Sequence, residues 1–514
     1  MSSLAEVLGA LSLATDLGSG VPFEKGLRTC VAASALAGTL DVSRDDRRAT
    51  YDAALLRSLG CTATSREFGA LFDDDVAVQR ELKTVDFGDP DVFASQLERF
   101  GHWADERRGR ELRSRFVSEV PVRGQELGRA GCEVSAALGS QLGLHPGAVA
   151  ALQEVYERWD GKGYPDGRGG DDLTLAARIV HVAEQAVMAH HEHGRAAAES
   201  EVCRRAGAHL DPQICATFAA HADAVFSALD VDDLLASAVA AEPPPVSRIG
   251  PAELDRICVA FASFADLKGT HLLGHSRHVA ELADGAAALL GLTASERVTL
   301  RTAALLHDIG RVGVPSSIWD RPGRLGAADW ERVRLHPYWT GRILSRWIGF
   351  ETVQAIACAH HERLDGSGYP SGARAAELSM SERVLAASDV FAALTEDRPH
   401  RLARSPQQAA TELDREVRSM RLDATCVSAV VEAAGLPRPR STWPNDLTTR
   451  EVDVLRLVAR GMTNREIGET LFVSPRTVQH HLASVYDKTG QRTRAGAAVF
   501  AMQHAIVPAT AQPT

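Results

Sequence analysis

Histidine and aspartate side chains recur through the middle of this 514-residue sequence, and their chemistry suits metal binding. The residues that carry the pattern are His275, His307, Asp308, His336, His360, His361 and Asp389. They lie too far apart to share one helix, so only folding can bring them together. Imidazole nitrogens and carboxylate oxygens are ligands that transition-metal ions accept. Asp308 could bridge two such ions, which would give a site for attack on a phosphoester.

The sequence around these residues predicts helices that end at the metal-type side chains. The apolar run 303–306 leads directly into His307 and Asp308, and the run 353–359 leads into His360. Burying so many polar groups is costly unless each finds a metal ion or a hydrogen-bond partner. The following turn, 365–370, reads Asp-Gly-Ser-Gly-Tyr-Pro, and its glycines permit positive φ. Such a loop could border a pocket whose backbone N–H groups face phosphate oxygens.

The composition limits the class of protein. Apolar residues make up 45% of the chain and charged residues 24%, as in soluble globular proteins. Aromatic residues are only 5% and alanine is abundant, which favours close-packed helices over sheets. No apolar run is long enough for a membrane span, and the first residues do not resemble a signal peptide. The eight cysteines form no C-x-x-C pair, which indicates reduced thiols and a cytoplasmic location.

The chain also contains an internal repeat. Residues 51–60 align with 301–310, residues 155–165 with 360–370, and residues 178–184 with 383–389. The first copy is longer between its markers, and we expect the insertion to be the charged stretch 73–115.

The metal-type residues are missing from the first copy. The replacements are Lys25 for His275, Arg57 for His307, Ser58 for Asp308, Val155 for His360, Tyr156 for His361 and Glu184 for Asp389. The apolar and glycine positions survive. We therefore expect a copy without metal, retained for packing, interaction or small-molecule sensing.

Breaks in composition predict the domain limits. The Pro-rich stretch 241–250 reads as a semi-rigid linker, and Pro-rich sequence recurs before residue 447. The predicted order is a first helical domain (1–240), a linker (241–250), a second helical domain (251–435), a linker (436–446), a small helical unit (447–507) and a tail (508–514).

The small helical unit has the pattern of a DNA-binding module. Thr448 can cap a helix with Glu451 three residues on, and Ser474 followed by Pro475 can start another. A short helix, a turn and a polar-faced helix fit the major groove, and the unit carries a small excess of basic side chains. The residues expected to contact DNA are Arg465, Ser474, Arg476, Thr477, Gln479, His480 and Lys488.

Two resemblances follow from these motifs. The ordered set from His275 to Asp389, with Gly368-Tyr369-Pro370, resembles the HD-GYP phosphohydrolases, a branch of the HD superfamily. Residues 447–507 resemble the LuxR-type helix-turn-helix, which implies duplex DNA as a partner, 474–482 as the recognition helix and a homodimer.

The HD-GYP resemblance implies an all-α fold and hydrolysis of cyclic di-GMP or a related cyclic dinucleotide at an iron or manganese site. By motif, the seven His and Asp residues would be the metal ligands, and Asp308, Arg311 and Arg398 would be catalytic. The substrate-binding residues implied are Arg311, Gly368, Tyr369, Pro370, Arg398 and Arg401.

Two departures from the family pattern bear on the chemistry. His271 stands where trinuclear members have Glu, so we expect two divalent metal ions. Arg311 stands where the family commonly has Lys, which keeps the charge and changes its geometry. The first interpretation is a phosphodiesterase attached to a DNA-binding module. The alternative is a non-enzymatic nucleotide receptor that regulates transcription. A third idea is that the first copy supplies a dimer interface.

Overall fold

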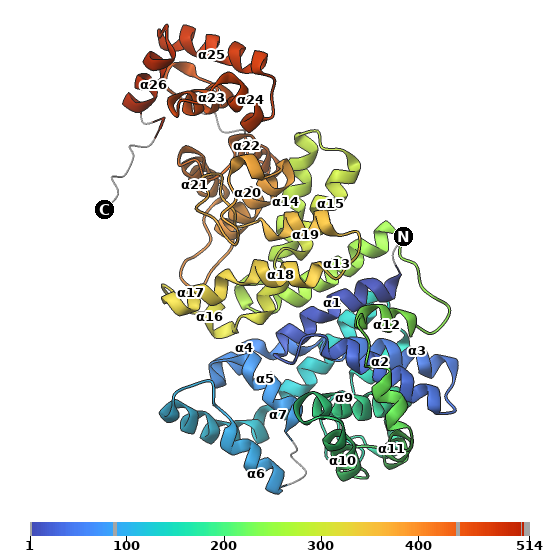
Figure 1. The fold of residues 1–514 in the computed structure, drawn as a ribbon. Coiled ribbons are helices and arrows are strands. Elements are labelled where there is room, and N and C mark those ends of the chain that lie inside the picture. Colours follow the sequence, from blue (N-terminus) through green and yellow to red (C-terminus); the bar gives the residue numbers. More distant parts are fainter. Residues whose placement is uncertain (1–2, 86–89, 438–442, 505, 508–514) are drawn as a thin grey trace. The chain divides into compact units, whose positions relative to one another are not determined.

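The protein is built from helices in a computed structural model, shown as a ribbon in Figure 1. The structure describes residues 3–85, 90–437, 443–504 and 506–507. Within these residues the only β-type pairings are isolated bridges, and no strand forms. The predicted all-α fold is confirmed. No helix in the described ranges combines the length and the apolar character that crossing a bilayer would require.

The chain divides into two compact units, and each is described by itself. The first unit comprises Met1–Arg277, Leu305–Gln354 and Arg398–His400. The second comprises His278–Ala304, Ala355–Asp397 and Arg401–Thr514. The predicted domain limits therefore stay a prediction.

The helices come in the following order. The first copy contains α1 (Leu4–Gly18), α2 (Lys25–Thr39), α3 (Arg44–Leu55), η1 (Cys61–Thr64), α4 (Ser65–Phe72), α5 (Asp75–Thr84), α6 (Pro90–Arg99), α7 (Glu106–Leu142), α8 (Pro146–Leu152), η2 (Gly170–Asp172), α9 (Leu175–His193), α10 (Arg195–Arg205), α11 (Pro212–Ser227) and α12 (Leu234–Ala240). The second copy contains α13 (Pro251–Asp266), η3 (Thr270–Leu272), α14 (His275–Leu289), α15 (Ala294–Leu306), η4 (Ile309–Gly313), α16 (Ser316–Trp319), α17 (Ala327–Arg334), α18 (His336–Leu344), α19 (Glu351–Cys358), η5 (Ala375–Glu377), α20 (Met380–Thr395), α21 (Pro406–Arg418) and α22 (Ala424–Ala433).

Matching local contacts support the internal repeat. The Asp16 carboxylate accepts from the Gly26 N–H at 3.1 Å, at the start of α2. The Asp266 carboxylate accepts from the Ser276 N–H, also at 3.1 Å, at the start of α14. Each copy thus ends its first long helix with a buried aspartate that caps the next one.

The insertion in the first copy builds a core of its own. The predicted insertion 73–115 takes in α5, α6 and the first part of α7. A cluster of buried apolar side chains holds these helices to α4; its members are Phe68, Phe72, Val78, Phe100, Leu112 and Phe116. Aromatic rings dominate this cluster in a chain otherwise poor in them, so the insertion is an ordered element rather than a long surface loop.

A buried ion pair inside the first unit joins the insertion to the second copy. Lys268 Nζ lies 2.5 Å from Asp75 Oδ2, and both side chains are fully buried. The other Asp75 oxygen accepts from the Ser316 N–H at 2.7 Å, and the Ser316 hydroxyl donates to the Lys268 carbonyl at 3.0 Å. Asp75, the first residue of α5, is therefore linked to Ser316, at the start of α16, both directly and through Lys268. All three residues are buried.

The C-terminal part of the second unit folds as the sequence predicts. It contains η6 (Pro444–Asp446), α23 (Thr449–Ala459), α24 (Asn464–Leu471), α25 (Pro475–Thr489) and α26 (Arg494–Gln503). Thr448 and Glu451 form a capping box at α23, and Ser474 caps α25 with Pro475 in the first turn. The tail 508–514 and residues 438–442 of the linker 436–446 lie outside the described residues.

The buried ion pair predicts a large effect on stability. Asp75→Ala would leave the Lys268 ammonium buried without its carboxylate, and breaking such a pair costs about 3–5 kcal/mol. We expect urea unfolding of the first unit to shift to lower urea by a corresponding amount. As a control, Asp73→Ala breaks the more exposed pair with Arg108 and should cost about 1 kcal/mol or less. Equal effects of the two substitutions would contradict the role assigned to Asp75.

Candidate active site and DNA-binding surface

Asp308 is the centre of a buried polar cluster in the first unit. It stands between α15 and η4, and the close approach of α18 to η4 depends on Gly310. A side chain at Gly310 would put its Cβ 2.2 Å from the His336 carbonyl oxygen. Thr340 joins the same elements, accepting from the Gly310 N–H at 3.1 Å and donating to the His307 carbonyl at 2.9 Å. This packing brings His336, at the start of α18, to Asp308.

Three imidazoles surround the Asp308 carboxylate. The distances from its oxygens to Nε2 are 3.1 Å for His307, 3.3 Å for His336 and 3.7 Å for His275. The ligand atoms of His275, His307 and Asp308 lie within 4.8 Å of one another, and all these side chains are buried. Buried imidazole nitrogens around a carboxylate are the donor set that a divalent transition-metal ion takes. The residues present therefore fit a metal ion.

A backbone hydrogen bond orients His336 as a ligand. Its Nδ1 lies 2.6 Å from the Val333 carbonyl oxygen, which can only accept. Nδ1 therefore carries a proton, and Nε2, which faces Asp308, is the atom that would bind a metal ion. Metal-binding histidines are commonly held in this way through their second ring nitrogen.

Arg311 sits directly on the cluster. Its guanidinium lies 2.5 Å from Asp308 Oδ2 and stacks 4.8 Å from the centre of the Trp319 ring. Burial of Asp308 would raise its pKa, but Arg311 and His307 outweigh burial and hold the pKa of Asp308 well below its usual value. The carboxylate is therefore charged. Arg398 is also at the site, with its guanidinium 3.4 Å from His275 Nδ1.

A cleft of about 780 Å³ opens beside this cluster within the first unit. Its lining is rich in cationic and aromatic side chains: His271, Arg311, Trp319, Arg321, Arg324, Trp330, Arg398 and His400. The volume is in the range of small-molecule sites. Sequence reasoning missed Trp319, Arg321, Arg324 and Trp330. The signal was present, because tryptophans and arginines alternate through 319–332, between two candidate ligands.

The second unit holds the remaining candidate ligands. His361 Nδ1 lies 3.7 Å from Asp389 Oδ2, and the adjacent His360 is buried. His360 Nδ1 lies 2.6 Å from the Ala357 carbonyl oxygen, so its Nε2 carries the lone pair. The Tyr369 ring packs 4.7 Å from the His361 ring, centre to centre.

The turn after His361 is fixed by one buried carboxylate. Glu362 accepts from the N–H groups of Ser371 at 2.7 Å and Ala373 at 2.9 Å. Gly368 lies so close to Glu362 that an added Cβ would come within 2.5 Å of the Glu362 Cα. Backbone packing therefore requires glycine at position 368, independently of any contact that Gly368, Tyr369 or Pro370 makes with substrate.

Arg401 has a structural role that the sequence did not reveal. Its guanidinium donates to the carbonyls of Leu394 at 3.1 Å and Glu396 at 3.3 Å, and also to that of Ala393. These bonds satisfy carbonyl groups at the end of α20. To bind substrate as predicted, the Arg401 guanidinium would have to give up some of these hydrogen bonds.

The first copy places fixed cations where the second has candidate ligands. Lys25 and Arg57 both form buried ion pairs with Glu184, and Arg57 also donates to the Val155 carbonyl at 2.8 Å. Burial would raise the pKa of Glu184, but Arg57 and Lys25 hold it well below its usual value. An ammonium and a guanidinium thus neutralise the carboxylate that aligns with Asp389.

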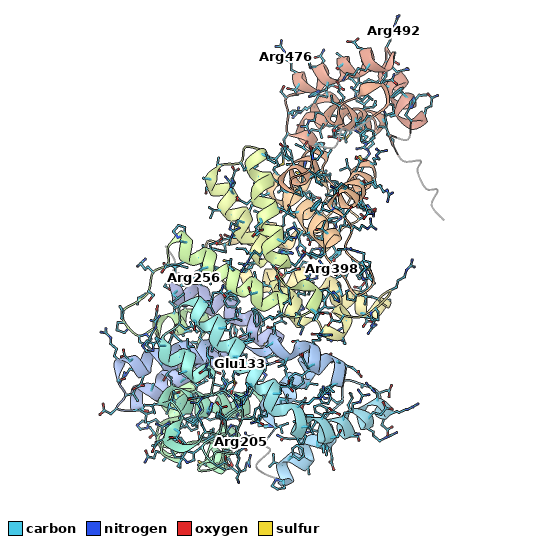
Figure 2. The ribbon with its side chains drawn as sticks, turned by 180° about the vertical axis from the view of Figure 1, so that it is seen from behind. Glu133, Arg205, Arg256, Arg398, Arg476 and Arg492 are labelled. Atoms are coloured by element: carbon cyan, nitrogen blue, oxygen red, sulfur yellow. The ribbon has the colours of Figure 1, made fainter. Side chains whose placement is uncertain are left out.

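The exposed face of α25 carries most of the predicted DNA contacts. Ser474, Arg476, Gln479 and His480 are exposed, while Val478, Leu482 and Val485 are buried as predicted. Arg476 and Arg492 project outward from this helical unit (Figure 2). An exposed polar helix face with a guanidinium in its first turn suits contact with base edges and phosphates.

Two of the predicted DNA contacts are engaged within the protein. Lys488 Nζ lies 2.7 Å from Glu451 Oε2, inside the capping box of α23. Arg465 pairs with Glu469 at 3.1 Å along α24, but both side chains are exposed. Arg465 can therefore turn to a phosphate at little cost, whereas Lys488 would give up a shielded partner.

Comparison with family models identifies two segments. Residues 260–426 match the HD domain model. Residues 445–501 match the model of the luxR family of bacterial regulatory proteins.

Known proteins are similar over more of the chain. A 3'3'-cGAMP-specific phosphodiesterase 3 of Vibrio cholerae is 29% identical over 84% of this chain and 95% of its own length. A cyclic di-GMP phosphodiesterase of Thermotoga maritima is 34% identical over 27% of this chain and 39% of its own. The crystal structure of a cyclic GMP-AMP-specific phosphodiesterase of V. cholerae superposes with a TM-score of 0.59 and 25% identity, covering 85% of this chain and 98% of that one.

The fold and the buried cluster define a metal-dependent phosphohydrolase of the HD class joined to a DNA-binding module. More narrowly, residues 260–426 form the HD domain and residues 445–501 the LuxR-type helix-turn-helix, and the chain is similar over most of its length to a cyclic-dinucleotide phosphodiesterase.

The Asp308 cluster predicts the metal content of the protein. Asp308→Asn keeps the side-chain volume but removes the charge that three imidazoles and a metal ion would share, so we expect at least about a tenfold loss of metal affinity. The bound metal is measured by plasma mass spectrometry after dialysis. His193→Ala, at an exposed histidine of the first copy, should leave it unchanged. Equal metal content in all three proteins would refute this assignment of Asp308.

The exposed α25 face predicts the effect of Arg476→Ala on DNA binding. Losing one phosphate or base contact should weaken binding by about 1–3 kcal/mol, and loss of a phosphate contact would lower the salt slope by about one. Binding is measured by fluorescence anisotropy over a range of salt concentrations. Arg415→Ala, at an exposed arginine outside the helix-turn-helix, is the control. Unchanged affinity of the Arg476 variant would count against this docking face.

Proposed function

We propose that the chain is a transcriptional regulator that hydrolyses a cyclic dinucleotide and that substrate occupancy or turnover alters its binding to duplex DNA. The observation that carries the hydrolytic part is the buried group of His275, His307, Asp308 and His336 beside an arginine-lined cleft. The named phosphodiesterase relatives, which act on 3'3'-cGAMP or cyclic di-GMP, support this substrate class.

We propose two divalent ions, iron or manganese, as the cofactors. The proposed ligands are His275, His307, Asp308, His336, His360, His361 and Asp389. When bound, such ions act as Lewis acids on the phosphoryl group and supply an activated water. The Glu-to-His departure at His271 is the reason for proposing two ions rather than three.

The cleft residues explain how a substrate would be held. Arg311 and Arg398 offer guanidinium groups to the phosphates, where they would offset charge that develops on phosphorus-bound oxygens. Trp319 and Trp330 offer flat apolar surfaces for the bases, because every nucleobase has a face that can stack on an aromatic ring. Burial of Asp308 and Arg311 strengthens the electrostatic interactions at that end of the cleft.

The alternative function is a nucleotide receptor without turnover, and one contact favours it. The Arg311 guanidinium already neutralises Asp308, the carboxylate expected to bridge the metal ions. A fixed cation at that position competes with a metal ion for the same charge. In that case binding of the nucleotide alone would regulate the DNA-binding module, which we propose to act as a homodimer.

Turnover by the purified full chain separates the two functions. With Mn or Fe added, we expect conversion of cyclic di-GMP or 3'3'-cGAMP to linear products, followed by chromatography. His307→Ala should lower the rate by about 100-fold or more, because it removes a ligand rather than a group that merely orients one. Arg311→Lys restores the residue usual in the family and should keep or raise the rate.

The outcomes have distinct meanings. Nucleotide that binds at the Arg311 and Arg398 cleft but stays intact would establish the receptor and exclude the enzyme. Turnover that survives His307→Ala would show that the chemistry lies elsewhere. The exposed-residue variant His193→Ala provides the control for handling and metal loading.

A further inference from the structure

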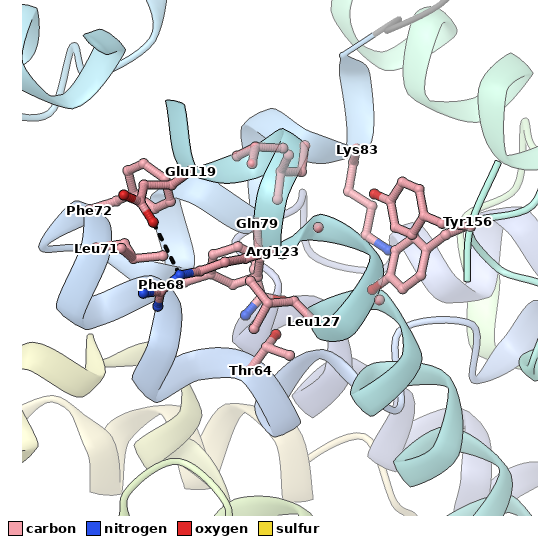
Figure 3. A pocket seen from close by; sticks show the side chains of 15 residues that line it. Thr64, Phe68, Leu71, Phe72, Gln79, Lys83, Glu119, Arg123, Leu127 and Tyr156 are labelled. Atoms are coloured by element: carbon pink, nitrogen blue, oxygen red, sulfur yellow. Dashed lines mark ion pairs between the residues drawn. The ribbon is translucent and has the colours of Figure 1, made fainter. Parts of the chain in front are cut away.

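The first copy contains a pocket that the proposed function does not use (Figure 3). It lies among α4, α5, α7 and the loop that ends at Tyr164. The residues that line it are Thr64, Phe68, Leu71, Phe72, Gln79, Leu82, Lys83, Glu119, Val120, Arg123, Gly124, Leu127, Gly128, Tyr156 and Tyr164. Three of these residues, Gln79, Leu82 and Lys83, belong to the insertion that distinguishes the first copy from the second.

The pocket borders one position of the first copy that aligns with a candidate ligand of the second. Tyr156 aligns with the candidate ligand His361, and Tyr164 aligns with Tyr369. Their rings stack, with centres 5.4 Å apart. The insertion brings Lys83, on α5, over the Tyr156 ring at 5.9 Å. At this position the first copy therefore has a tyrosine where the second has the candidate ligand His361, with the Lys83 ammonium over its ring.

The charges around Lys83 are out of balance. Lys83, Lys25 and Arg57 lie near a single strong carboxylate, Glu184, which the last two already pair with. The other nearby acid is Asp16, whose pKa burial raises to about 7, so it is only partly ionised. Among the described residues, no hydrogen bond or ion pair is formed by the Lys83 ammonium. Burial, with Lys25 and Arg57 nearby, lowers the pKa of Lys83 to about 8, although Glu184 opposes this shift.

The Lys83 side chain is partly buried and shares Glu184 with two other cations, so an anion beside its ammonium would reduce the unfavourable excess of positive charge. The walls near Lys83 are apolar and aromatic, supplied by Phe68, Leu127 and Tyr156. The Glu119–Arg123 ion pair, at 3.1 Å, completes the lining (Figure 3). This combination favours a ligand with one flat apolar part and one negative charge.

The size of the pocket limits the ligand. Its volume is about 50 Å³, against about 780 Å³ for the cleft beside Asp308. A single ordered water needs about 10–15 Å³ on such a scale, so the pocket has room for a small molecule of several atoms. A cyclic dinucleotide does not fit, but one ring with a short acidic substituent does.

We propose that the first copy binds a small aromatic monoanion in this pocket, with its ring against Phe68 and Tyr156 and its acidic group at Lys83. The degenerate copy is then a receptor for a ligand unlike the substrate of the second copy. This assignment stands whether or not the chain hydrolyses a nucleotide.

The test compares benzoate with benzamide, which has the same shape but no charge, by isothermal titration of the full chain. Benzoate should bind at least about tenfold more tightly, because only it pairs with the ammonium. Acetate, which has the charge without the ring, should bind more weakly than benzoate. Equal binding of benzoate and benzamide, or of benzoate and acetate, would overturn the proposal.

Variants locate the binding. Lys83→Met should weaken benzoate by at least about tenfold and leave benzamide unchanged, whereas Lys162→Met, at an exposed lysine of the same copy, should change neither. Leu127→Trp fills the pocket while keeping Lys83, so it should abolish benzoate binding even if Lys83→Met proves unstable. Arg398→Ala should have no effect. Benzoate binding lost with Arg398 and kept with Leu127→Trp would place the anion in the nucleotide cleft and refute the pocket.

Discussion

A carboxylate removed from water has to find positive charge, and this requirement shapes both copies of the repeat. In the second copy Asp308 is buried among three imidazoles and Arg311. The packing of η4 against α18, made possible by Gly310, exists around that charge. Imidazoles can turn from a carboxylate to a metal ion, so a carboxylate surrounded by them can accept such an ion. The need to neutralise Asp308 therefore both holds these helices together and provides a metal-binding set of side chains.

The first copy meets the same requirement with permanent cations. Glu184 aligns with Asp389, and Lys25 and Arg57 neutralise it through covalently attached charges. Such charges cannot leave or exchange, so the fold is held without a cofactor and without the reactivity that a cofactor brings. The two copies therefore differ in where the positive charge comes from, while each keeps a buried aspartate that caps the helix after its first long helix.

The sequence was sufficient for the helices, their caps and the repeat, because these depend on local spacing and on residue type. It located His307 and Asp308 through the apolar run before them. It could not reveal that Arg401 caps the end of α20, because this depends on how the turn after that helix folds back. It could not reveal that Lys488 pairs with Glu451, because packing brings these two distant residues together. The tryptophans of the cleft were missed for a related reason: an aromatic residue in a polar stretch does not show which cavity it faces.

The contact between Asp75 and Lys268 has a consequence for how this gene can evolve. The two residues sit in different copies, yet they share one water-free junction with Ser316. A shortened chain that began after the first copy would lose the Asp75 carboxylate and expose Lys268, Ser316 and the surface packed around them to water. Losing the first copy would therefore cost the second copy stability, which is a physical reason for keeping a half that has no candidate metal ligands at the aligned positions.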